Sequence, residues 1–216
     1  MKAKTIAILG LGRFGGTLAK ELESLNQEVL GVDSNEELVQ KHSNYLTHTV
    51  IADVTDIEVL KSLSLNQFDT VVVSIADDIR ASLMTTMLLK ELGIKSIIAK
   101  AKDSLHGKML EKIGADIVIY PERDMALRLA QQVIRENVVD YLKIAPDVGL
   151  VELEVPDILV GISLKESKLR EDYNLSVVAI KIGDDVEVPP NPTRPLDKRD
   201  KLLIIGHDED ILRLSK

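Results

Sequence analysis

The chain has 216 residues, 45% of them hydrophobic, which is enough for one large domain or two small ones with packed cores. Its 27 basic and 35 acidic side chains give a net charge of −8 and only 3% of its residues are aromatic, which argues against binding nucleic acid or anionic lipid. The absence of cysteine excludes disulfides and thiolate metal sites, and no apolar run approaches the roughly 20 residues of a membrane-spanning helix. We therefore expect a cytoplasmic protein.

Residues 4–120 alternate between apolar runs and helix-like stretches. The runs predict six strands, at Thr5–Gly10, Glu28–Asp33, Thr49–Asp53, Thr70–Ile75, Ser96–Ala101 and Ile117–Tyr120. One helical face follows the first run, at Phe14, Leu18, Leu22 and Leu25, and a helix-start signal at Ser34 and Asn35 follows the second. Apolar strands separated by helices predict an α/β fold with a Rossmann-like, doubly wound parallel sheet.

The stretch 122–142 reads as one long helix with two apolar faces. The first face comprises Ala126, Leu129, Ala130 and Val133, and the second comprises Leu127, Ile134, Val138 and Leu142. Because such a helix packs on two surfaces, we expect a crossover element between the first lobe and a partner subunit. A helix sandwiched within one domain is the alternative.

A smaller lobe is expected after a Pro/Gly break at 144–150. Its pattern predicts strands at 150–155, 176–182 and 201–206, helices at 163–172 and 208–214, and a proline-rich loop at 188–196. That order suits an antiparallel α+β lobe. The expected domains are thus 1–121, a crossover at 122–143, and 147–216.

A Gly-x-Gly-x-x-Gly motif occurs at Gly10, Gly12 and Gly15, between the first predicted strand and the first predicted helix. In this arrangement the first glycine makes the turn, the second lets a pyrophosphate approach, and the third lets helix and strand pack. The helix N-terminus attracts the phosphates. Asp33 ends the second strand, where a carboxylate accepts both ribose hydroxyls and repels a 2′-phosphate, which disfavours NADP. A glycine turn with a solvent-exposed Asp is the alternative.

Arg13 lies inside this turn. A guanidinium there adds a full charge where backbone dipoles already attract anions, so it suits ADP or ATP at least as well as a dinucleotide. The alternative is a side chain that points to solvent.

Catalytic machinery is not evident in the sequence. The four histidines are isolated, no Tyr-x-x-x-Lys pair occurs, and there is no P-loop. A nucleotide-binding fold without a chemical partner predicts a sensor rather than an enzyme.

Several segments distributed along the chain resemble one known family. They include "GLGRFG", "VLGVDSN", "EKIGAD", "PERDMA" and "SVVAIK". Together they resemble RCK-domain proteins, also called KTN or TrkA-N/TrkA-C proteins, and within them the regulatory subunits of Ktr-type potassium uptake systems.

The resemblance implies a subunit that gates a membrane potassium transporter, as a homodimer assembling into an octameric ring. It implies ATP or ADP in the N-terminal lobe, or NAD or NADH if the chain is of the Trk type. The residues implied at this site are Gly10, Gly12, Arg13, Phe14, Gly15, Asp33, Ser34, Asn35, Asp53, Val54, Ile75, Ala76 and Lys100. Glu122 is implied to bind a divalent or monovalent cation near the terminal phosphate. For Asp53, implied to lie near the adenine, a helix N-cap is the alternative.

The same resemblance implies that cyclic di-AMP binds between two C-terminal lobes. The implied residues are Ile162, Leu164, Arg170, Leu175, Ser176, Val177, Pro190 and Pro192. Ser176 stands where some members carry Asn, and Glu171 and Asp172 make this segment more acidic than is typical. A lobe that only dimerises is the alternative.

Two other functions stay open. A small NAD-dependent oxidoreductase would need a proton-relay residue near the nicotinamide. A Trk-type NAD(H)-binding subunit often carries both lobes twice, whereas this chain carries each once.

Overall fold

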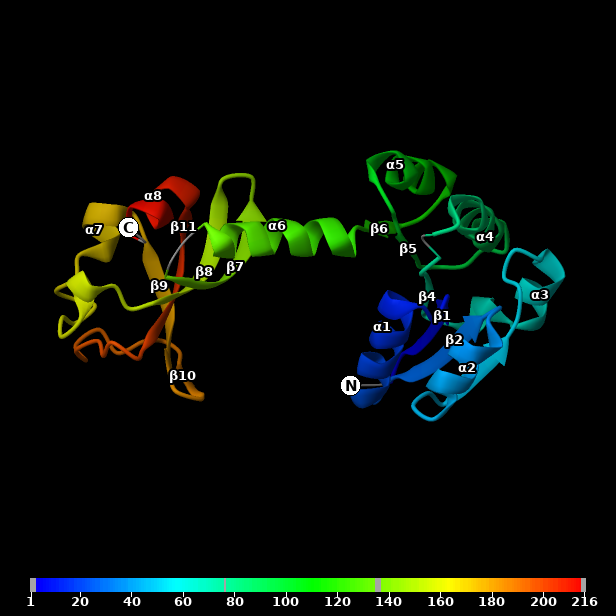
Figure 1. The fold of residues 1–216 in the computed structure, drawn as a ribbon, viewed down its shortest axis with the longest axis horizontal. Helices are drawn as coiled ribbons and strands as arrows, with labels where there is room; N and C mark the ends of the chain where they lie inside the picture. The colour runs from blue at the N-terminus through cyan, green and yellow to red at the C-terminus, as the bar shows by residue number, and fades with distance from the viewer. Residues whose placement is uncertain (1–2, 76, 135–136, 215–216) are drawn as a thin grey trace. The chain divides into compact units, whose positions relative to one another are not determined.

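The computed structural model describes residues 3–75, 77–134 and 137–214 (Figure 1). Its packing divides into two compact units, Met1–Pro121 and Glu122–Lys216. Within the described residues, no helix has both the length and the apolar character needed to cross a bilayer.

The N-terminal unit is built on a six-stranded parallel sheet in the order β3-β2-β1-β4-β5-β6. The strands are β1 (Thr5–Leu9), β2 (Glu28–Asp33), β3 (His48–Ile51), β4 (Thr70–Val73), β5 (Ile97–Lys100) and β6 (Ile117–Ile119). The helices are α1 (Arg13–Ser24), α2 (Glu36–Ser43), α3 (Ile57–Ser62), the short 3-10 helix η1 (Leu65–Gln67), α4 (Ile79–Glu91) and α5 (Ser104–Ile113). The predicted doubly wound sheet is confirmed, and every predicted strand end lies within two residues of the observed one.

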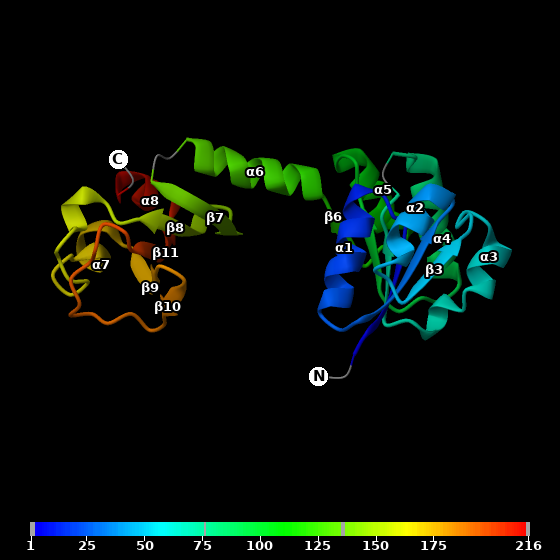
Figure 2. The ribbon, with the colours of Figure 1, turned by 60° about the horizontal axis from the view of Figure 1, so that its bottom comes forward.

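Alternation along β1 divides the core of this unit between the two faces of the sheet. Leu9 is buried in a cluster with Leu89 of α4, whereas Ile8 is buried in a separate cluster with Ala19 of α1. Figure 2 shows α1 and α4 about this sheet. Because successive side chains of a strand point to opposite faces, an uninterrupted apolar strand requires helices on both sides.

The face predicted for α1 is only partly buried. Leu18 and Leu22 pack against the cluster that contains Ile8, but the side chain of Leu25 is 64% exposed. α1 ends at Ser24, so Leu25 lies beyond the last helical residue and leaves the periodic face.

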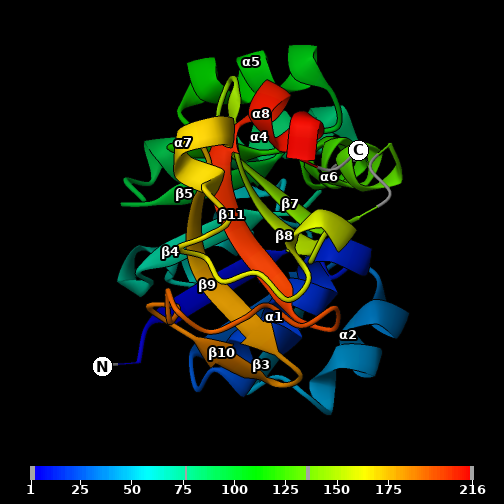
Figure 3. The same cartoon turned by 90° about the vertical axis from the view of Figure 1, so that its left-hand side faces the viewer.

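The C-terminal unit contains a five-stranded antiparallel sheet in the order β10-β9-β11-β8-β7 (Figure 3). Its strands are β7 (Val138–Ala145), β8 (Val148–Glu154), β9 (Ser176–Ile182), β10 (Asp185–Glu187) and β11 (Lys201–His207). Its helices are α6 (Pro121–Val133), the 3-10 helix η2 (Asp157–Leu159), α7 (Leu169–Tyr173) and α8 (Asp208–Leu214). The antiparallel lobe is confirmed, and β9 and α8 have the predicted bounds.

The single helix predicted over 122–142 is wrong in its second half. α6 ends at Val133, residues 135–136 lie outside the described structure, and β7 begins at Val138. The predicted break at 144–150 is mostly strand: only Pro146 and Asp147 form the tight turn of the hairpin between β7 and β8.

Tyr141 shows why this segment is a strand. Its side chain is 4% exposed and packs over Gly149 of β8, where an added Cβ would lie 2.5 Å from the ring. Its hydroxyl donates to Asp208 Oδ1 at 2.8 Å. Pairing with β8 therefore outweighs the local helical pattern, as tertiary contacts commonly do.

The helix predicted at 163–172 is shorter than expected. Lys168 has a φ of 50°, in the left-handed region, and only Leu169–Tyr173 is helical. A left-handed residue cannot belong to a right-handed helix, so the pattern before it forms turns instead.

Candidate functional site

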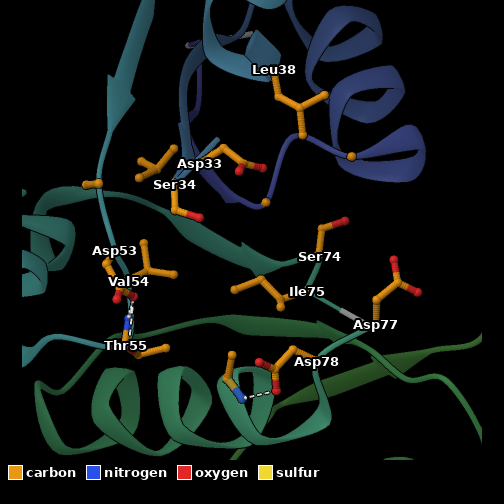
Figure 4. A pocket seen from close by; sticks show the side chains of 15 residues that line it. Asp33, Ser34, Leu38, Asp53, Val54, Thr55, Ser74, Ile75, Asp77 and Asp78 are labelled. Atoms are coloured by element: carbon orange, nitrogen blue, oxygen red, sulfur yellow. Dashed lines mark hydrogen bonds between the residues drawn. The ribbon is translucent and has the colours of Figure 1, made fainter. Parts of the chain in front are cut away.

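A cavity of about 460 Å³ opens at the carboxyl ends of β1, β2, β3 and β4 (Figure 4). The strands β2 and β3 are added on one side of β1, whereas β4, β5 and β6 are added on its other side. The order of the parallel strands therefore reverses between β1 and β4. Ligands of open α/β sheets bind at such a switch point. The lining residues are Gly10, Gly12, Val32, Asp33, Ser34, Leu38, Ala52, Asp53, Val54, Thr55, Ser74, Ile75, Asp77, Asp78 and Ala81.

Each of the three motif glycines has a different environment. Gly10 has a φ of +102°, which a residue with a Cβ rarely adopts. A Cβ on Gly15 would lie 1.9 Å from the carbonyl oxygen of Gly10, so this position requires glycine for α1 to pack on the turn. A Cβ on Gly12 would meet no atom within 4 Å, because this residue borders the open cavity.

Asp33 joins the glycine turn to the residues that follow β2. Its Oδ2 accepts the Leu11 N–H at 2.7 Å, and its Oδ1 accepts the Asn35 N–H at 2.8 Å. A carboxylate has about four acceptor positions, so both oxygens keep capacity for further donors such as ribose hydroxyls. The carboxylate thus organises the glycine turn as well as facing the cavity (Figure 4).

Asp53 lines the opposite side of the cavity from a short turn after β3. Its Oδ1 accepts from the hydroxyl of Thr55 at 2.7 Å and from the Thr55 N–H at 2.9 Å. The hydrogen bond from the Thr55 side chain is the main cause of a lowered pKa of the Asp53 carboxyl, and the bond from the Thr55 backbone adds to it. The carboxyl therefore stays ionised. The alternative role of helix N-cap is wrong for Asp53, because Asp56 caps α3 by accepting from the Glu58 N–H.

Among the described residues, the cavity is lined by four acids and by no lysine, arginine or histidine. Asp77 and Asp78 follow β4, and Asp78 also caps α4 by accepting from the Ala81 N–H. Sequence reasoning missed these two residues and Thr55 and Ser74. Their position directly after β3 and β4 is the signal that could have found them, because parallel strands bring their carboxyl ends together.

Seven of the residues implied at this site line the cavity: Gly10, Gly12, Asp33, Ser34, Asp53, Val54 and Ile75. Five others do not line it: Arg13, Phe14, Gly15, Asn35 and Lys100. Arg13 is the exposed first residue of α1, and Lys100 Nζ lies 5.7 Å from the centre of the Phe14 ring. Ala76 lies outside the described residues.

Glu122 is exposed in the first turn of α6, in the C-terminal unit. Over the part of the chain that the structure describes, no three His, Cys, Asp or Glu side chains gather as potential metal ligands.

A second cavity, of about 400 Å³, lies in the C-terminal unit. It is lined by Leu164, Lys165, Ser167, Lys168, Leu169, Arg170, Glu171, Leu175, Ser176, Val177, Pro190 and Pro192. All the residues implied for cyclic di-AMP are in this set except Ile162, whose backbone bonds to Leu159 and Leu196 instead.

Lys165 and Lys168 were missed by the sequence analysis. With Arg170 they give this cavity three cations against one lining acid, Glu171, in a chain whose net charge is −8. A local excess of positive charge on an acidic protein suits an anionic ligand. The signal available in the sequence was the basic spacing of "LKESKLR", which had been assigned to a helix.

Comparison with known proteins covers both units. Residues 6–121 match the TrkA-N domain model and residues 150–216 match the TrkA-C domain model. The chain is 43% identical to the Ktr system potassium uptake protein C of Bacillus subtilis (strain 168), over 99% of this chain and 96% of that protein. It is also 43% identical to the Ktr system potassium uptake protein A of the same organism, over 100% of this chain and 97% of that protein.

Solved structures of GsuK share the fold. The GsuK RCK domain matches 99% of this chain and 48% of that chain, with a TM-score of 0.70 and 20% identity. The GsuK channel bound to NAD matches 99% of this chain and 39% of that chain, with a TM-score of 0.69 and 21% identity. The resemblance first seen in the sequence motifs is confirmed: this chain belongs to the TrkA-N/TrkA-C family, alongside the Ktr system potassium uptake proteins.

Proposed function

We propose that this protein is the nucleotide-sensing regulatory subunit of a Ktr-type potassium transporter, acting from the cytoplasm without catalysing a reaction. The observation that carries the proposal is the cavity where the glycine turn meets Asp33, in a chain that aligns from end to end with Ktr proteins. A ligand that binds one subunit arrangement more tightly than another shifts the equilibrium between them.

Potassium-limited growth tests the transporter role. In Bacillus subtilis cells lacking Ktr proteins A and C, we expect this chain to restore growth at low potassium and Asp33→Ala to restore it poorly. Asp184→Ala, at an exposed turn of the C-terminal unit, serves as the matched control. If the Asp33→Ala chain restored growth as well as the original chain does, the N-terminal cavity would not be required for transport.

For the N-terminal cavity we propose ADP or ATP. The N-terminus of α1 offers N–H groups to phosphates, Gly12 leaves the approach open, and Asp33 keeps acceptor capacity for a ribose. Arg13, exposed at the first position of α1, is available to the terminal phosphates. NAD or NADH is the second candidate, favoured by the GsuK channel that was solved with NAD.

Competition binding separates these ligands. We expect ATP and ADP to displace a fluorescent ADP analogue at lower concentrations than NADH. NADPH should compete most weakly, because the lining carboxylates repel a 2′-phosphate. A preference for NADH would assign the protein to the Trk type.

For the C-terminal cavity we propose cyclic di-AMP, held between two subunits. Leu175, Val177 and the two prolines offer apolar walls for the bases, and Arg170 and the two lysines offer charge for the phosphates. Because both the ligand and an isologous dimer are two-fold symmetric, each contact can occur twice.

The proposed homodimer is supported by apolar surface on α6 and β7. Side chains more than half exposed there are Met125, Leu127, Leu129, Val133, Ile134, Leu142 and Ile144. Three of them, Met125, Leu127 and Leu142, line a groove of about 470 Å³. Exposed apolar side chains gathered at a groove mark a protein interface, and we propose that a second copy covers them. For the complete assembly, we further propose that these dimers form an octameric ring and that Glu122 binds a cation.

A further inference from the structure

The loop at 188–196 forms one wall of the C-terminal cavity. Pro190 and Pro192 line the cavity, and its other walls come from residues 164–171 and 175–177. The loop contains no helix or extended strand, so its shape must be held by side chains and by contacts with neighbouring segments.

Within this loop, the guanidinium of Arg194 is shared by two carboxylates. Arg194 Nη2 is 2.8 Å from Asp200 Oδ2, and Arg194 Nε is 3.6 Å from Glu187 Oε2. Both of these nitrogens and Glu187 Oε2 are buried without hydrogen-bond geometry among the described residues, so the contacts are ion pairs, and Asp200 is 3% exposed. The triad thus joins the end of β10 to the residue that precedes β11, across the base of the loop.

The same triad is connected to the cavity wall. Glu187 Oε1 accepts the Asn191 N–H at 2.9 Å, and Asn191 lies between the two lining prolines. From the opposite wall, the Lys165 N–H donates to the Pro192 carbonyl at 2.9 Å. The loop is therefore fixed to the triad on one side and to the lysine-bearing segment on the other.

We propose that Arg194 is the positioning residue of the C-terminal ligand site. It does not line the cavity, but its charge holds Glu187 and Asp200 so that the loop stands in the shape that forms the wall. A wall ordered in advance removes part of the ordering cost of binding. This inference rests on the proposed function, because cyclic di-AMP serves as the probe.

The test uses the full chain and two measurements. Calorimetric titration with cyclic di-AMP should show Arg194→Gln binding about tenfold more weakly, equivalent to about 1.4 kcal/mol. Hydrogen exchange of the ligand-free protein should be faster at the Asn191 and Lys165 amides but unchanged at Leu202 in the β11 ladder. Arg194→Lys, which keeps one cation for Asp200, should recover part of the affinity.

Arg199→Gln is the matched control. The Arg199 side chain is 92% exposed and pairs only with Asp197 among the described residues, so its loss should leave both readouts unchanged. If Arg194→Gln does not fold, Arg194→Met replaces it, because methionine keeps an unbranched apolar side chain while removing the charge.

Two results would overturn the inference: wild-type affinity in the folded triad variant, or exchange at Asn191 and Lys165 that does not change. If the original chain binds no cyclic di-AMP, the proposed ligand is wrong. The exchange measurement, which needs no ligand, then decides by itself whether Arg194 holds the loop.

Discussion

At the scale of single residues, Asp33 combines two tasks that the motif alone does not distinguish. The carboxylate bonds to the Leu11 N–H inside the glycine turn while it lines the cavity. Its loss therefore removes the acceptor proposed for the ribose and also leaves a turn N–H without its partner, which costs stability.

We expect Asp33→Ala to weaken adenine nucleotide binding by about 1.5–3 kcal/mol, the range for hydrogen bonds to a charged group. Calorimetry with ATP measures the affinity, and thermal unfolding measures the accompanying loss of stability. Asp56→Ala is the control, since Asp56 caps α3 outside the cavity. It should lower stability by about 1 kcal/mol and leave ATP affinity unchanged. Equal ATP affinity of Asp33→Ala and the original chain would remove the ribose role.

Two glycines of the turn should respond oppositely to the same substitution. Gly15→Ala drives a Cβ into the Gly10 carbonyl, so we expect a loss of about 1–3 kcal/mol in unfolding free energy. Gly12→Ala meets no protein atom and has a φ of −62°, so it should fold normally yet block the nucleotide. Thermal unfolding with and without ATP measures both. ATP binding by Gly12→Ala at wild-type affinity would show that phosphate does not approach this residue.

At the scale of elements, α6 and β7 are held together within the C-terminal unit but leave apolar side chains uncovered. Arg128 of α6 pairs with Asp140 of β7, and this hydrogen bond is the main cause of the lowered pKa of the Asp140 carboxyl. β7 is also an edge strand of its sheet. Edges and apolar faces of this kind favour association with another chain.

Charge on this apolar face should dissociate the proposed dimer. In Leu127→Glu each subunit loses the burial of a leucine, about 1.5–3 kcal/mol per side chain, and the two-fold interface doubles the loss. Sedimentation equilibrium should show monomers at concentrations where the original chain dimerises. Leu25→Glu, at an equally exposed leucine after α1, should leave the dimer intact. A Leu127→Glu dimer as tight as the original would place the interface elsewhere.

At the scale of the whole molecule, the two units should differ in their response to acid. Burial is the main cause of lowered pKa values at His42 and His106, both in the N-terminal unit. Lys41 and Lys102 add to the effect, while Asp33 and Asp103 oppose it. His42 Nδ1 is buried without a hydrogen-bond partner, so a proton there would be poorly solvated, and His106 Nδ1 accepts the Lys102 N–H at 3.2 Å, so a proton there would break this bond.

The sign of the pH effect follows from proton binding. Below the ordinary histidine pKa of about 6.5, the unfolded chain takes up protons that the folded chain does not, so stability falls as pH falls. We expect urea unfolding of the N-terminal unit to require less denaturant at pH 5.5 than at pH 7.5. His106→Gln should reduce this difference, whereas His48→Gln, at an exposed residue, should not. Stability of the N-terminal unit that does not change over this range would contradict the prediction.

Much of the N-terminal site was predictable because it depends on local sequence. Gly10, Gly12 and Asp33 are recognised by their spacing from strand ends, and the structure brings them to one cavity. Asp77 and Asp78 were not predicted, because their place beside Asp33 depends on β4 pairing with β1. Lys165 and Lys168 were not predicted either, because the left-handed Lys168 precedes the observed helix, whereas the sequence pattern predicts a helix from 163 onward.

The sequence by itself determined the strands and parallel sheet of the N-terminal unit, the glycine turn and the family, because periodicity and glycine spacing act over a few neighbouring residues. Only the tertiary structure decided that Val138–Ala145 is a strand and that the C-terminal cavity joins Arg170 to Pro190 and Pro192. Those outcomes depend on contacts between residues far apart in the chain. Tyr141 packs against Gly149 and bonds to Asp208, and the free energy of such packing exceeds the small differences in local helix propensity.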